Sequence, residues 1–280
     1  MLKVNIHSAG YEIGEKTIHD IAFSIEKGEL VALIGANGAG KSTTIKTMLG
    51  LLVNMNGEIS FGEKKNPYAY GPEHPTYYDY LTLWEHIELL MAARENEVGS
   101  WERKAEELLH MFRMDKHKHE YLSKFSKGVK QKSMLILAFL TEPDFYIIDE
   151  PFIGLDPVAT KEFLSYLYKE KERGAGILLC THVLDTAERI CERFLLISQG
   201  TLVADGHLEA IQTLAEMEVH TFGNRLDSCV IYYYSSTYIY GNLLSITMDG
   251  NIIDGRDGLF RIRLTRILSC NIFERCTLVF

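Results

Sequence analysis

Several features that would assign the chain to other classes of protein are missing from its sequence. The longest uncharged apolar run, from Met134 to Leu140, is far shorter than the roughly 20 residues that cross a bilayer. The first residues contain no apolar signal-peptide core, and the five cysteines form no Cys-x-x-Cys pair. Acidic residues outnumber lysine and arginine by 38 to 29, so no broad basic face for nucleic acid is expected. These absences predict a cytoplasmic protein with reduced thiols that does not bind nucleic acid.

The order of apolar segments indicates an α/β fold. The 280 residues are 46% hydrophobic and 24% charged, which is ordinary for one large domain with or without a small appendage. Strand-like segments alternate with segments of helical periodicity, which predicts a parallel sheet covered by helices on both faces. The expected strands are 2–7, 21–25, 29–34, 57–61, 145–148, 177–180 and a hairpin of 194–198 and 201–204. The expected helices are 43–52, 82–94, 101–112, 133–140, 159–173 and 185–192, and prolines and glycine at 67–75 predict a loop.

A glycine-rich turn follows the apolar run at residues 31–34. It satisfies the phosphate-loop pattern of two glycines five positions apart followed by lysine and serine or threonine. Glycines let the backbone N–H groups point at a polyphosphate, the lysine reaches the β and γ phosphates, and the hydroxyl can hold Mg²⁺. The predicted phosphate-contacting residues are Gly35, Asn37, Gly38, Ala39, Gly40, Lys41, Ser42 and Thr43, with Lys41 also catalytic and Ser42 also a metal ligand. A purely structural glycine turn is the alternative.

Two adjacent carboxylates end the apolar strand at residues 145–148. Because side chains alternate along a strand, Asp149 and Glu150 point in different directions and cannot do the same work. Asp149 suits a Mg²⁺ site, and Glu150 suits the attacking water. Taken alone, the pair could be the solvated end of a strand. The phosphate loop upstream favours the catalytic interpretation.

A further motif, Phe125-Ser126-Lys127-Gly128-Val129, precedes this strand. Ser126 can cap a helix whose N-terminus faces an anion. With this motif in place, the order of motifs resembles the ATP-binding subunit of ATP-binding-cassette (ABC) transporters, which carry Leu-Ser-Gly-Gly-Gln at this point. Ser126 and Gly128 match that signature, whereas Phe125, Lys127 and Val129 depart from it. A plain capped helix with solvated lysines is the alternative.

Other elements of the ABC pattern follow in order. Tyr11, 24 residues before Gly35, matches the aromatic residue that stacks on adenine, with a core tyrosine as the alternative. Glu73 stands where the family's Q-loop has glutamine, which keeps an oxygen for Mg²⁺ or water and adds charge. Asp156 matches the D-loop, and His182 matches the switch histidine that contacts the γ-phosphate. The resemblance thus implies Tyr11, Glu73, Ser126, Gly128 and Asp156 as nucleotide contacts, Asp149 and Glu73 as Mg²⁺ ligands, and Glu150 and His182 as catalytic residues.

The resemblance covers residues 1 to about 215 and is similar in particular to the Ecs-type ATP-binding subunits of Gram-positive bacteria. The segments 75–86, 125–132 and 146–152 look like that group. The resemblance implies a P-loop NTPase fold of the ABC type in residues 1–217, with a parallel-sheet core, an antiparallel β subdomain and a helical subdomain at about 76–140. It also implies an ATPase that uses ATP and Mg²⁺ and forms a head-to-tail dimer with a second copy of itself.

An integral membrane transporter subunit is the other partner that the resemblance implies, which would hold the chain at the inner face of the cell membrane. We expect residues 77–94 to make this contact through Tyr77, Tyr78, Tyr80 and Trp84, with a core position for Trp84 as the alternative. A soluble ABC-type ATPase acting on ribosomes or nucleic acid is a second hypothesis, disfavoured by the single cassette without a long coiled-coil insertion. A regulator without turnover is a third, disfavoured by the intact catalytic residues.

The composition changes near Glu218. No lysine follows residue 171, and tyrosines gather at 232–240. Turn-forming Asp-Gly pairs at 249–250 and 257–258, with period-two alternation at 260–265, predict a small β-rich extension in residues 218–280. A tail that never evolved to fold is the alternative, and the sequence leaves both open.

Overall fold

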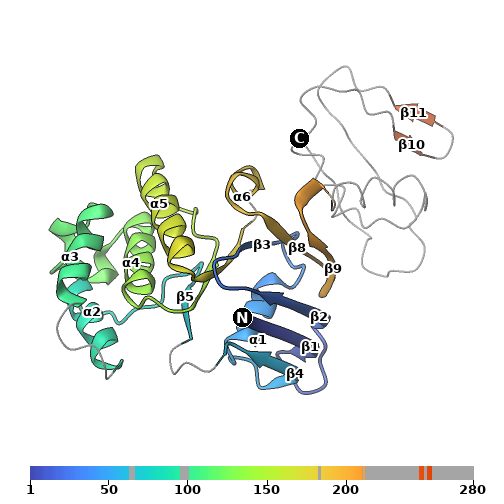
Figure 1. Ribbon diagram of the computed structural model, residues 1–280, viewed down its shortest axis with the longest axis horizontal. Coiled ribbons are helices and arrows are strands. Elements are labelled where there is room, and N and C mark those ends of the chain that lie inside the picture. The colour runs from blue at the N-terminus through green and yellow to red at the C-terminus, as the bar shows by residue number, and fades with distance from the viewer. Residues whose placement is uncertain are drawn as a thin grey trace. The chain divides into compact units, whose positions relative to one another are not determined.

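The computed structural model describes residues 1–62, 67–94, 101–181, 184–209, 211, 246–248 and 251–253 (Figure 1). The chain divides into two compact units, Met1–Leu208 and Glu209–Phe280. In the second unit, β10 (Ile246–Met248) and β11 (Asn251–Ile253) pair antiparallel across residues 249–250, where the sequence predicts a strand pair. The strand pair expected around 257–258 lies outside the described residues, as does the alternating stretch at 260–265.

A six-stranded sheet forms the core of the first unit. Its order is β5-β6-β7-β3-β8-β9, and all neighbours are parallel except the β8–β9 hairpin. The strands are β3 (Leu30–Ile34), β5 (Tyr68–Gly71), β6 (Phe145–Asp149), β7 (Gly176–Cys180), β8 (Arg193–Ser198) and β9 (Thr201–Gly206). Every residue of β3, β6 and β7 is buried, as continuous apolar strands in the middle of a parallel sheet require. The predicted parallel-sheet core and its terminal hairpin are confirmed.

The edge strand β5 corrects the loop that we expected at residues 67–75. Residues Tyr68 to Gly71 pair parallel with Phe145 to Ile148 of β6. The strand has only 4 residues, too few for a periodic signal, and a proline precedes it while a second follows it. It forms because the open edge of β6 offers partners to its backbone, and a local pattern cannot reveal that edge.

A separate antiparallel sheet, in the order β2-β1-β4, consists of β1 (Leu2–Gly10), β2 (Ile18–Ile25) and β4 (Asn54–Ser60). In β1 the residues Leu2, Val4 and Ile6 are buried and alternate with exposed polar residues, so one face of this sheet packs on the core. One buried cluster joins that face to α1 (Lys41–Met48) and to one face of the larger sheet. The antiparallel subdomain that the family resemblance implies is therefore present.

The helices of the first unit are α1, α2 (Leu83–Ala92), α3 (Trp101–Met111), α4 (Lys127–Leu140), α5 (Pro157–Arg173) and α6 (Leu184–Ile190). Helix α4 contacts α2 and α3, and the three gather on one side in Figure 1. Helix α4 begins six residues before the expected 133–140 because Ser126 caps it, accepting the N–H of Val129. None of the described helices is long and apolar enough to cross a membrane.

Helices α4 and α5 pack on the other face of the six-stranded sheet through an aromatic cluster. Phe139 of α4 lies 5.6 Å from Tyr146 of β6, 5.9 Å from Phe163 and 4.4 Å from Tyr166 of α5, measured between ring centroids. All four side chains are buried. Aromatic pairs at such distances add to the burial of apolar surface, so this cluster fixes both helices on the strand that carries the predicted carboxylates.

Asp156 caps α5 and ties it to α4. Its carboxylate accepts the N–H of Ala159 at 2.8 Å and pairs with the Nζ of Lys132 at 2.8 Å. The hydrogen bond from Lys132, followed by the one from Ala159, lowers the pKa of Asp156 to about 2. The sequence matched this residue only to the D-loop, and its spacing carries no sign of the pairing with Lys132.

Two substitutions of Asp156 distinguish the contribution of the helix cap to stability from that of the ion pair. We expect Asp156→Ala to lower the free energy of unfolding by about 0.5–2 kcal/mol, since both interactions are lost. Asp156→Asn keeps a good cap and should lose less than about 1 kcal/mol, because the pair with Lys132 is half-exposed. Urea unfolding at neutral pH measures both variants. Equal losses for the two would contradict the cap, and an Asp156→Asn chain as stable as the native chain would contradict the ion pair.

The same variants carry a pH dependence. The folded pKa of Asp156 lies below the unfolded value of about 3.9, so its charge stabilises the fold above that pH. This stabilisation is lost as pH falls toward 2. The advantage of the native chain over Asp156→Asn should therefore shrink when urea unfolding is repeated at successively lower pH from 5 to 3. A constant difference would contradict the lowered pKa.

Candidate functional site

The phosphate loop lies between the end of β3 and the start of α1. Gly35 has φ +153°, and a Cβ there would lie 2.3 Å from the carbonyl oxygen of Ile197 in β8. Gly38 faces open space, but its φ of +81° lies in the left-handed region. Gly35 is thus required by the close approach of a neighbouring strand, and Gly38 by the backbone turn itself. The sequence predicted the turn but could not show the packing.

The N-terminus of α1 is left open for an anion. Gly40 is the N-cap and contributes no side-chain hydrogen bond, and no acidic residue occupies the first turn. Its N–H donors and the positive end of the helix dipole are therefore available to phosphate. The carbonyl of Ala39 accepts the N–H of Gly200, which holds the loop against the β8–β9 turn. Asn37 is exposed at the tip of the loop, whereas Thr43 is buried in the first turn of α1.

The side chain of Lys41 points back toward the start of the phosphate loop. Its side chain is only 7% exposed, and its Nζ donates to the carbonyls of Gly35 at 2.8 Å and Ala36 at 3.1 Å. Buried ammonium groups need such partners. A triphosphate in the loop would offer charged oxygens in place of these carbonyls. The Lys41 ammonium could then exchange its carbonyl acceptors for phosphate oxygens.

Asp149 comes to the phosphate loop from the end of β6. Its Oδ2 lies 3.5 Å from the Oγ of Ser42, although 107 residues separate the two in the chain. Burial raises the pKa of Asp149, and Glu150 and Glu73 raise it further, whereas the Cys180 side chain and Lys41 act in the opposite direction. The buried Oδ1 has no hydrogen-bond partner among the described residues. An orphaned carboxylate oxygen beside a hydroxyl fits Mg²⁺, which prefers hard oxygen ligands and relieves the repulsion between these acids.

Glu150 has an unusual backbone. Its φ is +49°, a left-handed conformation that non-glycine residues rarely adopt. Its N–H donates to the carbonyl of Cys180 at 2.8 Å, and its Oε2 accepts a hydrogen bond from the Oγ1 of Thr181 at 3.3 Å. The side chain is buried. Strained backbone held by several interactions clusters at functional sites, so the geometry at Glu150 supports a chemical role over that of a solvated strand end.

Cys180 is a site residue that the sequence did not reveal. It lies opposite Asp149 in the parallel register of β6 and β7, and its buried thiol is close enough to lower the pKa of the Asp149 carboxyl. Burial raises the pKa of this thiol, so the sulfur remains protonated and can act as the donor. Tyr70 of β5 also lies close to Asp149, and burial raises the pKa of its hydroxyl. Only the register between strands brings these residues together.

Tyr11 lies beside the first turns of α1. Its hydroxyl is 3.4 Å from the Oγ1 of Thr43, and the Nζ of Lys46 lies 5.3 Å from its ring centroid. The residue is 53% exposed, which excludes the core-tyrosine alternative and leaves ring surface for a base to stack on. Glu73 follows β5 in the next loop, half-buried, with its carboxylate 3.8 Å from the Nδ1 of His74 and close enough to raise the pKa of Asp149.

In the part of the chain that the structure describes, the signature residues Ser126 and Gly128 do not join the phosphate loop of their own chain. A Cβ on Gly128 would lie 2.3 Å from the carbonyl oxygen of Gly154, so Gly128 packs against the loop between β6 and α5. Asp156 ends that loop as the cap of α5. None of the hydrogen bonds or ion pairs among the described residues joins Ser126, Gly128 or Asp156 to the phosphate loop of the same chain. His182 lies outside the described residues.

Comparisons with known proteins agree with this geometry. The ABC transporter family profile matches residues 18–153. The uncharacterized ABC transporter ATP-binding protein YthP of Bacillus subtilis (strain 168) is 51% identical over 218 residues, covering 78% of this chain and 92% of YthP. The ABC-type transporter ATP-binding protein EcsA of the same organism is 39% identical over 221 residues, covering 76% of this chain and 89% of EcsA.

Solved structures show the same fold. A structure of an ATP-binding subunit of an ABC transporter superposes with a TM-score of 0.74 at 40% identity, covering 84% of this chain and 98% of that chain. The dimeric ATP-binding cassette MJ0796, bound to ADP and Pi, superposes with a TM-score of 0.66 at 21% identity, covering 74% of this chain and 99% of that chain. With the phosphate loop and the buried carboxylates on the same sheet edge, the chain belongs to the ABC transporter family as an ATP-binding subunit and is an ABC-type ATPase.

Proposed function

We propose that this chain hydrolyses ATP with Mg²⁺ in sites that two copies share head to tail, and that hydrolysis drives a separate membrane-spanning subunit. The observation that carries the proposal is the meeting of Ser42 and Asp149, 3.5 Å apart, at the mouth of a phosphate loop. Tyr11 would stack on the adenine, and the loop residues Gly35 to Thr43 would hold the phosphates. We place the chain at the inner face of the cell membrane through its partner.

The chemistry is positioning and charge stabilisation of the transferred phosphoryl group. Lys41 would leave its carbonyl partners for the β and γ phosphates. Ser42 and Asp149 would hold Mg²⁺, with Glu73 as the third candidate ligand, and the ion when bound would neutralise charge on the phosphate oxygens. Glu150 would orient the attacking water and accept its proton, and His182 would contact the γ-phosphate.

The shared site is supported by where the signature residues lie. Ser126 and Gly128 begin α4 and rest on the loop that follows Glu150, without a polar contact to their own phosphate loop. A helix N-terminus with a serine cap binds anions, so Ser126, Gly128 and Asp156 are suited to a nucleotide held by a second copy. The MJ0796 cassette, which shares the fold, is dimeric and bound to ADP and Pi, which supports a second copy of this chain as a partner.

Contact with the membrane subunit is supported by the exposed aromatic residues before α2. Tyr78 is 64% and Tyr80 89% exposed, whereas Trp84 is half-buried 5.7 Å from Trp101 with Lys118 over its ring. We therefore assign the contact to Tyr78 and Tyr80 and leave Trp84 to the packing of the helical subdomain. The alternative, a soluble ATPase acting on ribosomes or nucleic acid, predicts that the chain purifies without an integral membrane protein.

Glu150→Gln tests the catalytic carboxylate. The amide keeps the shape but cannot accept the proton, so hydrolysis should fall at least 100-fold while ATP affinity stays within about threefold. Phosphate release and equilibrium nucleotide binding measure the two effects. Glu172→Gln, an exposed acid on α5, is the matched control and should leave both unchanged. Turnover of Glu150→Gln within about tenfold of the native chain would assign the chemistry to another residue.

A mixture of Lys41→Ala and Ser126→Arg chains, each also carrying Glu150→Gln, tests the shared site. Lys41→Ala damages the site that its own chain builds, and Ser126→Arg damages the site across the interface. A mixed dimer therefore has both lesions in one site and an intact second site, so it should trap one ATP per two chains. Each variant alone should trap almost none.

Differently tagged chains show that mixed dimers form, and the trapped nucleotide is counted after rapid desalting. Counting nucleotide avoids any assumption about whether one intact site suffices for hydrolysis. Mixed dimers that hold no more ATP than either variant alone would exclude the head-to-tail site.

Tyr80→Glu tests the membrane contact. A charge in place of this exposed ring should prevent co-purification with an integral membrane protein from native membranes, while ATP turnover of the isolated chain stays the same. Tyr168→Glu, at a half-exposed tyrosine of α5, is the control for a surface charge. Equal recovery of the membrane partner with the native chain and with Tyr80→Glu would rule out this surface.

A further inference from the structure

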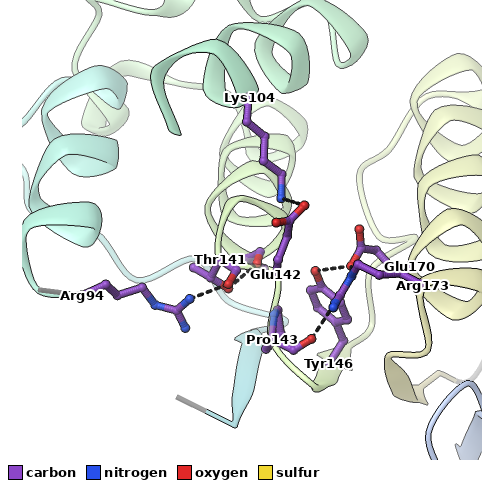
Figure 2. Close-up of polar contacts among 9 residues, drawn as sticks. Arg94, Lys104, Thr141, Glu142, Pro143, Tyr146, Glu170 and Arg173 are labelled. Atoms are coloured by element: carbon purple, nitrogen blue, oxygen red, sulfur yellow. Dashed lines mark hydrogen bonds and ion pairs between the residues drawn. The ribbon is translucent and has the colours of Figure 1, made fainter. Parts of the chain in front are cut away.

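The connection from α4 to β6 is held by cations from three different helices (Figure 2). Arg94, just past the end of α2, donates from Nη1 to the carbonyl of Thr141 at 2.5 Å. Lys104 of α3 forms an ion pair of 2.5 Å with the carboxylate of Glu142. At the next residue, the Nη2 of an arginine at the end of α5 donates to the carbonyl of Pro143 at 2.5 Å. Three consecutive residues of the connection are thus each fixed by a different helix.

This connection has little backbone stabilisation of its own. Carbonyls at the end of a helix have no partner within it, which leaves that of Thr141 to be satisfied from outside. Glu142 has φ +42°, in the left-handed region, and Pro143 has no N–H to donate. Side-chain cations therefore provide the hydrogen bonds that the backbone of this connection does not make. Such charge-assisted hydrogen bonds to carbonyls are stronger than those between neutral groups.

The cations hold the connection from two sides. Arg94, just past α2, and Lys104 of α3 come from the helical subdomain that packs around α4. Arg173 belongs to α5 on the sheet, and its Nε also donates at 2.7 Å to the buried carboxylate of Glu170. That carboxylate accepts the hydroxyl of Tyr146 at 3.0 Å, and Tyr146 lies in the strand that ends at the catalytic carboxylates. Figure 2 shows these side chains converging on the turn between α4 and β6.

Helix α4 turns small changes at this connection into larger ones at its other end. Its 14 residues make it about 21 Å long, so a tilt of about 5° moves the capping serine by roughly 2 Å. Hydrogen bonds to a phosphate tolerate much less than that. Near the serine, Gly128 and the pair of Lys132 with Asp156 hold α4 against the loop after Glu150. The cationic connection is therefore the second of two anchors for α4.

We propose that Arg94 and Lys104 are positioning residues for the shared ATP site: by fixing the connection between α4 and β6, they set the direction of α4 and place Ser126 against the nucleotide of the partner chain. This inference rests on the proposed head-to-tail function. Neither residue contacts the nucleotide, and each acts on the site of the other copy through α4. Loosening either cation weakens closure of the dimer and leaves the capture of ATP by each chain intact.

The experiment compares Arg94→Met and Lys104→Met in full-length chains that also carry Glu150→Gln. ATP affinity is measured by titration at protein concentrations where the chain is monomeric. The dissociation constant of the ATP-bound dimer is measured by sedimentation velocity. Both variants should raise the dimer dissociation constant about tenfold with ATP affinity unchanged within twofold. Arg94→Lys, which can still donate to the carbonyl, should recover part of the loss.

Two control variants sharpen the comparison. Arg103→Met removes a neighbouring cation of α3 that is exposed and, among the described residues, pairs with Glu107 on the same helix, so the dimer constant should not change. Ala105→Gly lowers the stability of the same helix without removing a cation, so it shows what destabilisation alone does. Arg173 is not replaced, because its loss would leave the buried Glu170 carboxylate without its cation.

The outcomes separate this inference from the function it rests on. If the Glu150→Gln parent stays monomeric with ATP, the shared site is wrong and the positioning role falls with it. If the parent dimerises and Arg94→Met and Lys104→Met dimerise equally well, only the positioning role is overturned. That role is also overturned if Ala105→Gly weakens the dimer as much as they do, or if their ATP affinity falls in parallel with dimerisation.

Discussion

The buried carboxylate of Asp149 is the constraint on which the rest of the structure depends. One of its oxygens has no partner among the described residues, burial raises its pKa, and two further acids lie nearby. A protein keeps such a group only where a ligand compensates it. The phosphate loop, with a serine hydroxyl 3.5 Å away, faces the same point, so the Mg²⁺ and nucleotide of the proposed function would supply the missing partner. In that proposal the bound ligands relieve the cost of burying this carboxylate beside two other acids.

The parallel sheet makes this arrangement possible. Strands β3, β6 and β7 run in the same direction, so the residues that follow them emerge at one edge. Gly35 leaves β3 there, Asp149 ends β6 there, and Cys180 ends β7 beside it. The carbonyl of Cys180 accepts the N–H of Glu150, and the register of β6 and β7 places Cys180 opposite Asp149. Hydrogen-bond register, and not sequence proximity, sets the spacing of the proposed catalytic groups.

Helix α4 connects this edge with the second half of the proposed shared site. At its start it carries the capping serine, and Gly128 rests on the loop after Glu150. At its end, cations from α3, from α5 and from the residue Arg94 after α2 hold the turn into the strand of Asp149. The groups suited to a partner's nucleotide and those suited to the chain's own are therefore mechanically linked within one chain.

The sequence by itself determined the phosphate loop, the carboxylate pair, the cap at Ser126 and the alternation of strands with helices. These depend on neighbouring residues: glycine spacing, a strand's alternation, and a serine three residues before the N–H it accepts. The ABC resemblance added the order of motifs, and comparison with relatives confirmed the family. Of the long-range contacts, the sequence predicted only that residues following parallel strands would lie at the same edge of the sheet.

The tertiary structure alone decided the edge strand β5, the contact of Cys180 with Asp149, the pair of Lys132 with Asp156 and the cations on the α4–β6 connection. Each joins residues far apart in the chain, and each depends on strand register or helix packing. Trp84 illustrates the same limit at a single residue. Its position in the sequence is compatible with either the surface or the core. The contacts of its ring with Trp101 and Lys118 show that it packs within the helical subdomain. A local pattern fixes which face a side chain takes within its element, but the neighbour on that face comes from another part of the chain.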